Sequence, residues 1–242
     1  MFRFFVSSKD VLTKSIRLNA DDSGHIRSLR LRPDEKFIIC DGNNTDYICQ
    51  LGERSSGASV EIVGQYESNG EPGIKCNIYI AYSKGDRLDY AVQKSVELGV
   101  HEIILFESER CVAVPHDIPK KVKRLQRIAL ETAKQCNRGI IPFVSSTGKF
   151  NTMLDDAVEK SAYTLLFYED EDNVHLKDIM EQQLSFTSIS LITGPEGGFE
   201  PFEIDLARSK EIPVISLGPR VLRSETAPVV ALAAIMYQTG NL

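Results

Sequence analysis

Short runs of β-branched and aromatic residues, separated by polar segments, occupy the first 65 residues of the chain. Such runs are typical of short strands, and they cover residues 2–6, 37–40, 47–51 and 58–63. Between two of them, residues 41–44 read Asp-Gly-Asn-Asn, which predicts a tight hairpin because glycine and asparagine tolerate positive φ angles. We therefore expect a small β-barrel over residues 1–70, followed by a polar linker over residues 67–73.

A different pattern begins at residue 74, where apolar runs of strand length alternate with helical stretches. The runs cover residues 76–82, 103–106, 163–168, 189–193 and 214–217. This alternation predicts βα units on a parallel sheet. We therefore expect residues 74–242 to form a separate domain of the α/β class.

Three helices of this second domain have the clearest patterns. Residues 87–98 place apolar side chains at helical spacing and stop at Gly99, a residue suited to a helix C-terminus. Pro201 suits the first turn of a helix that runs to about residue 210. Residues 229–237 are apolar on nearly all sides, so this helix must be buried in the core or against a partner subunit.

The net charge of −6 is unevenly distributed along the chain. The first forty residues are rich in cations, whereas residues 155–211 are strongly acidic. Residues 115–138 hold only two anions against the cations Lys120, Lys121, Lys123, Arg124, Arg127, Lys134 and Arg138. This helix could bind RNA phosphates, and an ordinary solvated helix face explains the same charges equally well.

The composition argues against a disulfide framework, a metal site and a membrane span. The five cysteines are scattered and form no C-x-x-C pair, and the four histidines form no metal-spaced pair. No apolar run approaches the roughly 20 residues of a membrane helix, and the chain does not open with a basic and then apolar leader. We expect reduced thiols, a cytoplasmic location and no metal ion.

Two glycine-containing segments follow predicted strands, at residues 193–199 and 217–226. In open parallel sheets, ligands bind beyond the carboxyl ends of strands, and glycine lets the backbone approach a flat ligand such as adenine. Glycine and proline are also ordinary turn residues, so one such loop alone would not indicate a ligand. Two such loops, with the charged residues Arg220, Arg223 and Glu225 beside them, favour a ligand site. The sequence lacks the G-x-G-x-x-G and G-x-x-x-x-G-K-[ST] fingerprints, which disfavours dinucleotides and nucleoside triphosphates as the ligand.

These segments also carry a resemblance to a known family. Residues 192–199 (ITGPEGGF) and 217–227 (LGPRVLRSETA) resemble the signatures of the small-subunit ribosomal RNA uridine-N3 methyltransferases, a family of the SPOUT superfamily. Shorter blocks similar to this family lie at residues 3–6, 25–30, 84–86, 93–100, 108–110 and 135–138. Ser224 stands where the family commonly has threonine and Asn137 where glycine is frequent, and both keep a small polar residue.

The resemblance implies a PUA-like β-barrel that binds RNA, followed by an α/β domain with a trefoil knot. It further implies a homodimer that uses S-adenosylmethionine to methylate N3 of a uridine in 16S ribosomal RNA of the small subunit. The cofactor contacts that it implies are Leu166, Phe167, Tyr168, Thr193, Gly194, Pro195, Gly197, Gly198, Leu217, Gly218, Arg220, Leu222, Thr226 and Ala227.

Methylation at N3 requires an exposed base and stabilisation of the charge that develops on the uracil oxygens. We hypothesise that Arg138 and Arg223, together with Arg220, hold a phosphate or these oxygens, with structural ion pairing as the alternative for each. Glu196 and Glu225 are candidates for the base that removes the proton, although Glu196 can equally hydrogen-bond its own loop. The expected RNA contacts are Arg3, Arg17, His25, Arg27, Arg30, Lys84, Arg87, Arg110 and Arg124.

Two other functions remain open at this point. A non-catalytic RNA-binding or ribosome-assembly protein could keep the same fold without the activity. A dinucleotide-dependent oxidoreductase fits the βα alternation, although the fingerprint that it requires is missing.

Overall fold

The computed structural model describes residues 2–32, 34–51, 59–181 and 186–242. The chain forms two compact units, which we describe separately. The first contains residues 1–71 and 133–141, and the second contains residues 72–132 and 142–242. The first of these divisions, between residues 71 and 72, lies within the polar segment 67–73. The return of residues 133–141 to the first unit was not predicted.

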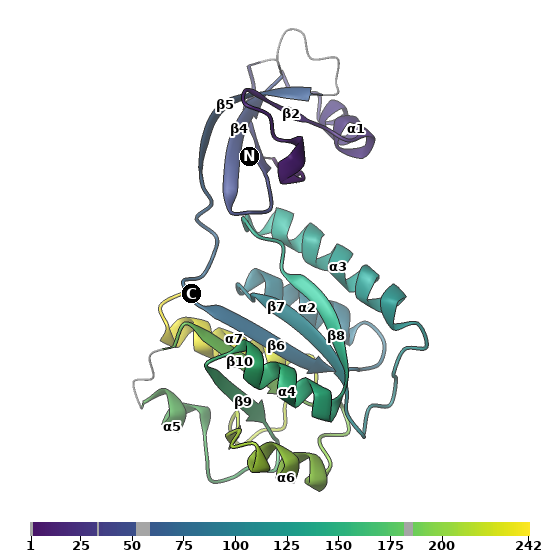
Figure 1. Cartoon of the computed structure of the whole chain (residues 1–242), viewed down its shortest axis with the longest axis vertical. Helices are drawn as coiled ribbons and strands as arrows, with labels where there is room; N and C mark the ends of the chain where they lie inside the picture. The colour runs from purple at the N-terminus through teal and green to yellow at the C-terminus, as the bar shows by residue number, and fades with distance from the viewer. Residues whose placement is uncertain (1, 33, 52–58, 182–185) are drawn as a thin grey trace. The chain divides into compact units, whose positions relative to one another are not determined.

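The first unit is built around a five-stranded sheet in the order β1-β3-β4-β5-β2, of which β2, β4 and β5 are labelled in Figure 1. Its only parallel pair among the described strands is β1 with β3. The strands are β1 (Arg3–Phe5), β2 (Ser15–Arg17), β3 (Phe37–Cys40), β4 (Thr45–Gln50) and β5 (Ser59–Glu67). The predicted strands are confirmed, except that residue 58 lies outside the described residues, and β2 was missed.

The hairpin between β3 and β4 is also confirmed. Gly42 and Asn44 both have positive φ angles, of 75° and 66°. The Asp41 carboxylate accepts hydrogen bonds from the amides of Asn43 (2.8 Å) and Thr45 (3.2 Å), which closes the turn.

A short 3-10 helix η1 (Ser8–Asp10) and the helix α1 (Ala20–Ser28) complete the first unit. The sequence did not predict α1 because it carries one fully buried apolar residue, Ile26, among polar ones. Its N-terminus is capped by Asn19, whose side chain accepts a hydrogen bond from the Asp22 amide at 2.7 Å. The core that α1 helps to cover contains Phe4, Ile16, Ile26, Phe37, Ile39, Cys49 and Val60.

The second unit contains a six-stranded sheet in the order β11-β9-β10-β6-β7-β8, and all its pairs are parallel. The strands are β6 (Lys75–Ala81), β7 (Glu102–Glu107), β8 (Phe143–Lys149), β9 (Tyr163–Phe167), β10 (Ser188–Thr193) and β11 (Val214–Ile215). The five predicted strands and the parallel sheet are therefore confirmed. The edge strand β8 was missed because its sequence, Phe-Val-Ser-Ser-Thr-Gly-Lys, is mostly polar.

Helices cover both faces of this sheet (Figure 1). On one face α4 packs against α6, and on the other α2 packs against α7. The helices of this unit are α2 (Arg87–Glu97), α4 (Phe150–Lys160), α5 (Leu176–Met180), α6 (Pro201–Ser209), α7 (Ala227–Gln238) and most of α3 (Ile118–Gln135), whose last residues, 133–135, belong to the first unit. The three predicted helices correspond to α2, α6 and α7, and the basic segment is α3.

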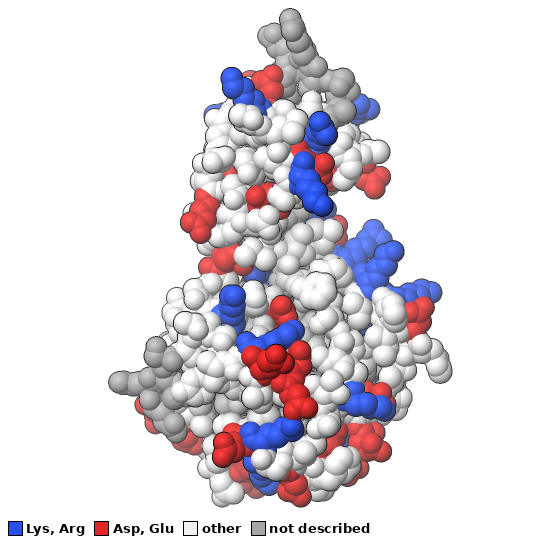
Figure 2. Space-filling model, viewed as in Figure 1, with Lys and Arg blue, Asp and Glu red and all other residues white. Residues whose placement is uncertain are grey.

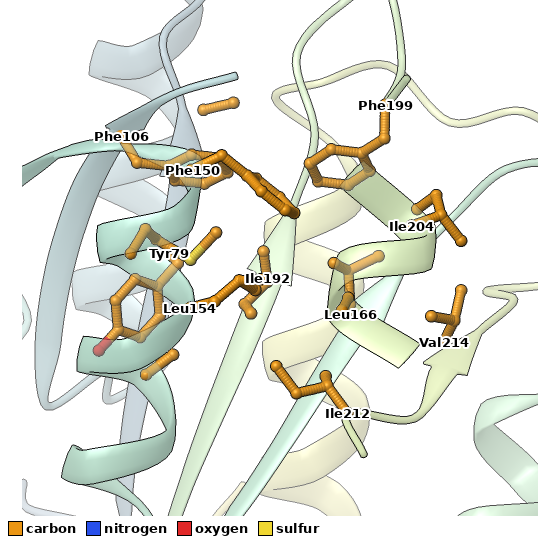
Figure 3. Packing of buried hydrophobic residues seen from close by; sticks show 14 of the residues in the cluster. Tyr79, Phe106, Phe150, Leu154, Leu166, Ile192, Phe199, Ile204, Ile212 and Val214 are labelled. Atoms are coloured by element: carbon orange, nitrogen blue, oxygen red, sulfur yellow. The ribbon is translucent and has the colours of Figure 1, made fainter. Parts of the chain in front are cut away.

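The core beneath α4 and α6 fixes the carboxyl ends of the strands (Figure 3). Phe106 from the end of β7, Phe150 from α4 and Phe199 from the loop after β10 lie together, with ring centroids 5.5–6.5 Å apart. Leu166 and Ile192 extend this cluster along β9 and β10. Since β9 lies between β10 and β11, the loops that follow these three strands emerge side by side.

Candidate functional site

A cavity of about 300 Å³ lies at the carboxyl ends of β9, β10 and β11. Its walls come from the loops that follow these strands, from the start of α7 and from Arg87 of α2. Both glycine-containing segments line it, as expected for a ligand site at this edge of a parallel sheet. The volume falls at the lower end of the range of small-molecule sites in proteins.

The first glycine loop, residues 194–199, is fixed by a buried side chain and by hydrogen bonds. The Phe199 ring is fully buried in the core, and the Thr193 hydroxyl donates to the Tyr79 carbonyl oxygen at 3.2 Å. Gly198 has a φ of 70°, and its amide closes a turn onto the Pro195 carbonyl at 3.1 Å. A side chain at this position would be strained, so glycine is required for this path of the backbone.

The second glycine loop, residues 216–226, presents main-chain groups to the cavity. Gly218 has a φ of 112°, which residues with a Cβ rarely adopt. Within the described residues, the amides of Leu217 and Leu222 donate no hydrogen bond to another protein group. Backbone donors of this kind need an acceptor from a ligand or from water.

Three charged side chains form a network on one wall of the cavity. The Arg87 guanidinium donates to Glu196 Oε1 at 2.5 Å, and its Nε lies 3.6 Å from Glu225 Oε2. The Lys84 amide donates to the same Glu196 oxygen at 2.8 Å. The second oxygen of Glu196, Oε2, is buried and has no partner among the described residues. A ligand that donates a hydrogen bond from an amine or hydroxyl would satisfy it.

The environment of Glu196 disfavours its candidate role as a proton acceptor. Burial by itself would raise the pKa of the Glu196 carboxyl, but hydrogen bonds from the Lys84 amide, its own amide and Arg87 outweigh it and hold the pKa below its ordinary value. A carboxylate with a lowered pKa binds a proton weakly. Its hydrogen bonds with the Lys84 amide and Arg87 agree with the alternative that Glu196 holds its loop in place.

The lowered pKa of Glu196 predicts a pH-dependent contribution to stability. A carboxylate with a lower pKa in the folded state stabilises the fold above its unfolded pKa, and this contribution is lost as the pH falls through the folded pKa. We expect the melting-temperature difference between the native protein and Glu196→Gln to be largest above pH 4.5 and to shrink below it. Glu159→Gln, at an exposed position on α4, is the matched control. A difference for Glu196→Gln that is constant over the whole range would contradict this role.

Arg220 and Arg223 are the exposed cations of the cavity wall. Their guanidinium groups have no ion-pair or hydrogen-bond partner in the part of the chain that the structure describes. The structural ion pairing that the sequence left open for them is therefore not observed. Both remain available to bind an anion or a carbonyl oxygen.

Most of the expected cofactor contacts lie at this cavity. The residues that line it are Phe167, Tyr168, Thr193, Gly194, Pro195, Leu217, Gly218, Arg220, Leu222 and Ala227. Gly197, Gly198 and Thr226 belong to the same loops but do not line it. Leu166 is different, because its side chain is fully buried in the core beneath α4 and α6. Leu166 itself does not line the cavity.

Four lining residues were not expected from the sequence. They are Glu169, Ser216, Val221 and Ser224. Glu169 follows the end of β9 and could have been found from its position after a predicted strand. The other three lie within the second glycine loop, where the sequence alone does not show which side chains turn toward the cavity.

Two arginines expected to contact RNA or substrate form buried ion pairs instead. Arg3 binds both carboxylate oxygens of Asp46, at 2.6 and 2.7 Å. Arg138 binds Glu71 through Nη2 at 2.6 Å and Nε at 3.2 Å. Both guanidinium groups are almost fully buried within the first unit. Arg138 therefore has the structural ion pair that the sequence left open as its alternative role. Arg3 was expected to contact a phosphate, and this expectation is corrected, because its guanidinium is paired with Asp46.

The other expected RNA contacts fall into two groups. Arg17, His25, Arg27, Arg30 and Lys84 lie at exposed positions. Arg87, Arg110 and Arg124 are ion-paired with Glu196, Glu200 and Asp89, respectively. Lys and Arg side chains gather over α3 in Figure 2, although Arg124 and Lys121 share Asp89 as a partner.

Neither a metal centre nor a membrane helix is found in the described parts of the chain. No group of three or more histidine, cysteine, aspartate or glutamate side chains among these residues is arranged to hold a metal ion. None of the described helices combines the length and the apolar character of a membrane span.

Comparison with known proteins agrees with this architecture and site. The chain matches the RNA methyltransferase domain model over residues 70–236 and the RNA methyltransferase PUA domain model over residues 18–63. A ribosomal RNA small subunit methyltransferase E from Mesomycoplasma hyopneumoniae is 33% identical over 237 residues, covering 96% of this chain and 97% of that protein. The protein of the same name from Bacillus subtilis is 30% identical, covering 90% of this chain and 87% of that protein.

Comparison with solved structures also finds similarity to ribosomal RNA small subunit methyltransferases E. The crystal structure of a ribosomal RNA small subunit methyltransferase E from Neisseria gonorrhoeae bound to S-adenosyl methionine superimposes with a TM-score of 0.86 at 30% identity. The superposition covers 98% of this chain and 97% of that chain. A PUA-like sheet joined to a parallel α/β domain with a glycine-loop cavity defines an RNA methyltransferase of the SPOUT class. Within that class, the chain belongs to the ribosomal RNA small subunit methyltransferase E family.

Proposed function

We propose that this protein transfers a methyl group from S-adenosylmethionine to N3 of a uridine in 16S ribosomal RNA of the small subunit. The observation that carries this proposal is the glycine-loop cavity, which is lined by Leu217 and Leu222, whose amides have no protein partner in the described part of the chain, and by Glu196, one oxygen of which has none there. Family membership and the S-adenosyl methionine complex of a relative support it. Ribosomal RNA as the substrate places the reaction in the cytoplasm.

The residues of the cavity fit S-adenosylmethionine. Leu217 and Leu222 offer amide donors and apolar side chains suited to the adenine. The unpaired Glu196 Oε2 suits a hydroxyl or ammonium donor of the ligand. Glu169, Glu196 and Glu225 bring three carboxylates to the walls of the cavity, and Arg87, Arg220 and Arg223 balance their charge. The walls therefore offer partners for both the cationic and the carboxylate groups of this ligand. When bound, S-adenosylmethionine supplies an electrophilic methyl group on its sulfonium.

The arginines of the second glycine loop are assigned to the RNA. Arg220 and Arg223 bind a phosphate or the uracil carbonyl oxygens, on which negative charge develops when the N3 proton leaves. Glu225 is the remaining carboxylate candidate for the group that removes this proton. It lines the cavity and accepts a hydrogen bond from the Ser224 hydroxyl at 3.3 Å.

A transfer assay tests the proposal. Small ribosomal subunits that lack the modification are incubated with the protein and S-adenosylmethionine labelled in its methyl group. The expected result is label in the 16S RNA. Retention of RNA binding without transfer would favour the non-catalytic assembly protein. Saturable binding of a nicotinamide dinucleotide in place of S-adenosylmethionine would favour the oxidoreductase.

We further propose that two copies of the chain associate through the outer side of α7. Val230, Ala233, Ala234 and Tyr237 recur at the i, i+3, i+4 and i+7 spacing of one helix face, and none of them is fully buried. The opposite side, with Ala231, Leu232 and Ile235, is packed into the core. A helix with an apolar stripe on each side is stabilised when a partner covers the second one.

Tyr237→Lys should therefore shift the native protein from dimer to monomer in light scattering, because it places a charge in the apolar stripe. Phe143→Lys on β8, another exposed aromatic position, is expected to leave the mass unchanged. A monomeric native protein would contradict the proposed dimer.

A further inference from the structure

The first unit contains a second cavity, of about 400 Å³, that the proposed methyl transfer does not use. The residues that line it are Arg3, Ile38, Asp46, Tyr66, Asn69, Gly70, Cys136 and Asn137. We name this cavity the Tyr66 pocket. All of its lining residues belong to the first unit.

Arg3, which lines this pocket, carries a buried donor without a partner in the described parts of the chain. The Arg3 side chain is only 6% exposed. Its two terminal nitrogens bond Asp46, and Nη2 also reaches Ser68 Oγ (3.2 Å) and the Arg138 carbonyl (2.8 Å). The Arg3 Nε–H is buried and has no acceptor among the described residues. A buried donor of this kind is costly to the fold unless an acceptor enters from outside the protein.

The charge of the pocket selects a neutral ligand. Asp46 neutralises the Arg3 guanidinium at hydrogen-bond distance, and the nearby Arg138 is paired with Glu71. A phosphate would therefore meet no unpaired cation on these walls, whereas a carbonyl oxygen can accept from Arg3 Nε without adding charge.

The remaining walls suit a flat group with polar edges. The Tyr66 side chain is 41% exposed at the end of β5 and can stack on a planar ring. Ile38 is apolar, and the amides of Asn69 and Asn137 can both donate and accept hydrogen bonds. Asn137 is fixed at a φ of 61°. Single-stranded RNA is commonly held by this combination of an aromatic face and hydrogen-bonding side chains.

We propose that the Tyr66 pocket binds one unstacked nucleobase of the substrate RNA, with a base carbonyl oxygen accepting from Arg3 Nε. This inference rests on the proposed action on RNA, and it adds a site at which the first unit reads an unpaired nucleotide. The base stacks on Tyr66, and the asparagine amides contact its edges.

The absence of tryptophan from the chain allows a direct test. Tyr66→Trp places a single fluorophore in the pocket, and Val63→Trp places one at an exposed position on the same strand. We expect a single-stranded six-nucleotide RNA to quench Tyr66→Trp saturably, and to leave Val63→Trp nearly unchanged. The same sequence as a duplex should not quench either variant. Equal quenching of both variants, or none, would overturn the inference.

A second pair of measurements separates this inference from the proposed function. Tyr66→Ala is expected to weaken binding of single-stranded RNA by about ten-fold, whereas Tyr66→Phe should retain it because the ring remains. Asn137→Gly removes the amide without straining the positive φ, and it should weaken binding as well. If the native protein methylates subunits and Tyr66→Ala binds single-stranded RNA as tightly as the native protein does, the pocket inference is wrong and the proposed function stands. If the native protein transfers no methyl group, the proposed function fails whatever the fluorescence shows.

Discussion

Arg223→Ala is expected to lower the rate of methyl transfer by about 100- to 1000-fold, the usual effect of removing one donor that stabilises developing charge. Arg223 lines the cavity, is exposed, and has no partner among the described side chains. Because the glycine loops are assigned to the cofactor and the arginines to the RNA, the same variant should bind S-adenosylmethionine with native affinity. Single-turnover transfer and calorimetric titration of the cofactor measure the two quantities.

Arg208→Ala is the matched control for this prediction. Arg208 is an exposed arginine on α6 that pairs with Glu171 and does not line the cavity. It should transfer methyl groups at the native rate. A native rate for Arg223→Ala, or a parallel loss of cofactor binding, would contradict the division of roles between the glycines and the arginines.

Arg3→Ala is expected to lower the free energy of unfolding by about 3–5 kcal/mol, because it leaves a buried carboxylate without its partner. Asp46 is 3% exposed and receives two hydrogen bonds from the Arg3 guanidinium. Loss of Arg3 also leaves Ser68 and the Arg138 carbonyl without this donor. Chemical denaturation followed by circular dichroism measures the change.

Arg17→Ala controls for the loss of an arginine in the same unit. Arg17 lies at an exposed position at the end of β2, and its replacement should change stability by less than about 0.5 kcal/mol. If Arg3→Ala were as stable as Arg17→Ala, the ion pair would not have the structural role assigned to it.

Local sequence patterns predicted the second unit well because its strands are buried on both faces. Such strands appear as continuous apolar runs, as in 189–193 and 163–168, and each run is followed by the loop that builds the cavity. The position of the ligand site at the carboxyl ends follows from the parallel sheet alone. Helix α4, which the sequence analysis did not predict, covers the same core, and the helical spacing of its buried apolar residues is the signal that indicates it: Phe150, Met153, Leu154 and Ala157.

The roles of the buried arginines could not be predicted from the sequence. Asp46 is 43 residues from Arg3, and Glu71 is 67 residues from Arg138. No local pattern shows that these pairs meet, and a surface cation looks the same as a buried one in the sequence. The return of residues 133–141 to the first unit has the same origin, because it depends on contacts between distant segments such as Gly139 with Cys40 and Glu71.

The site of methylation is the most direct measure of the proposed activity. Small subunits treated with the native protein and labelled S-adenosylmethionine are digested to nucleosides, and the labelled nucleoside is identified by mass spectrometry. We predict that the label is in 3-methyluridine from 16S RNA, and that reverse transcription of this RNA stops at one position because N3 can no longer pair. Label in any other nucleoside, or none in RNA at all, would contradict the account.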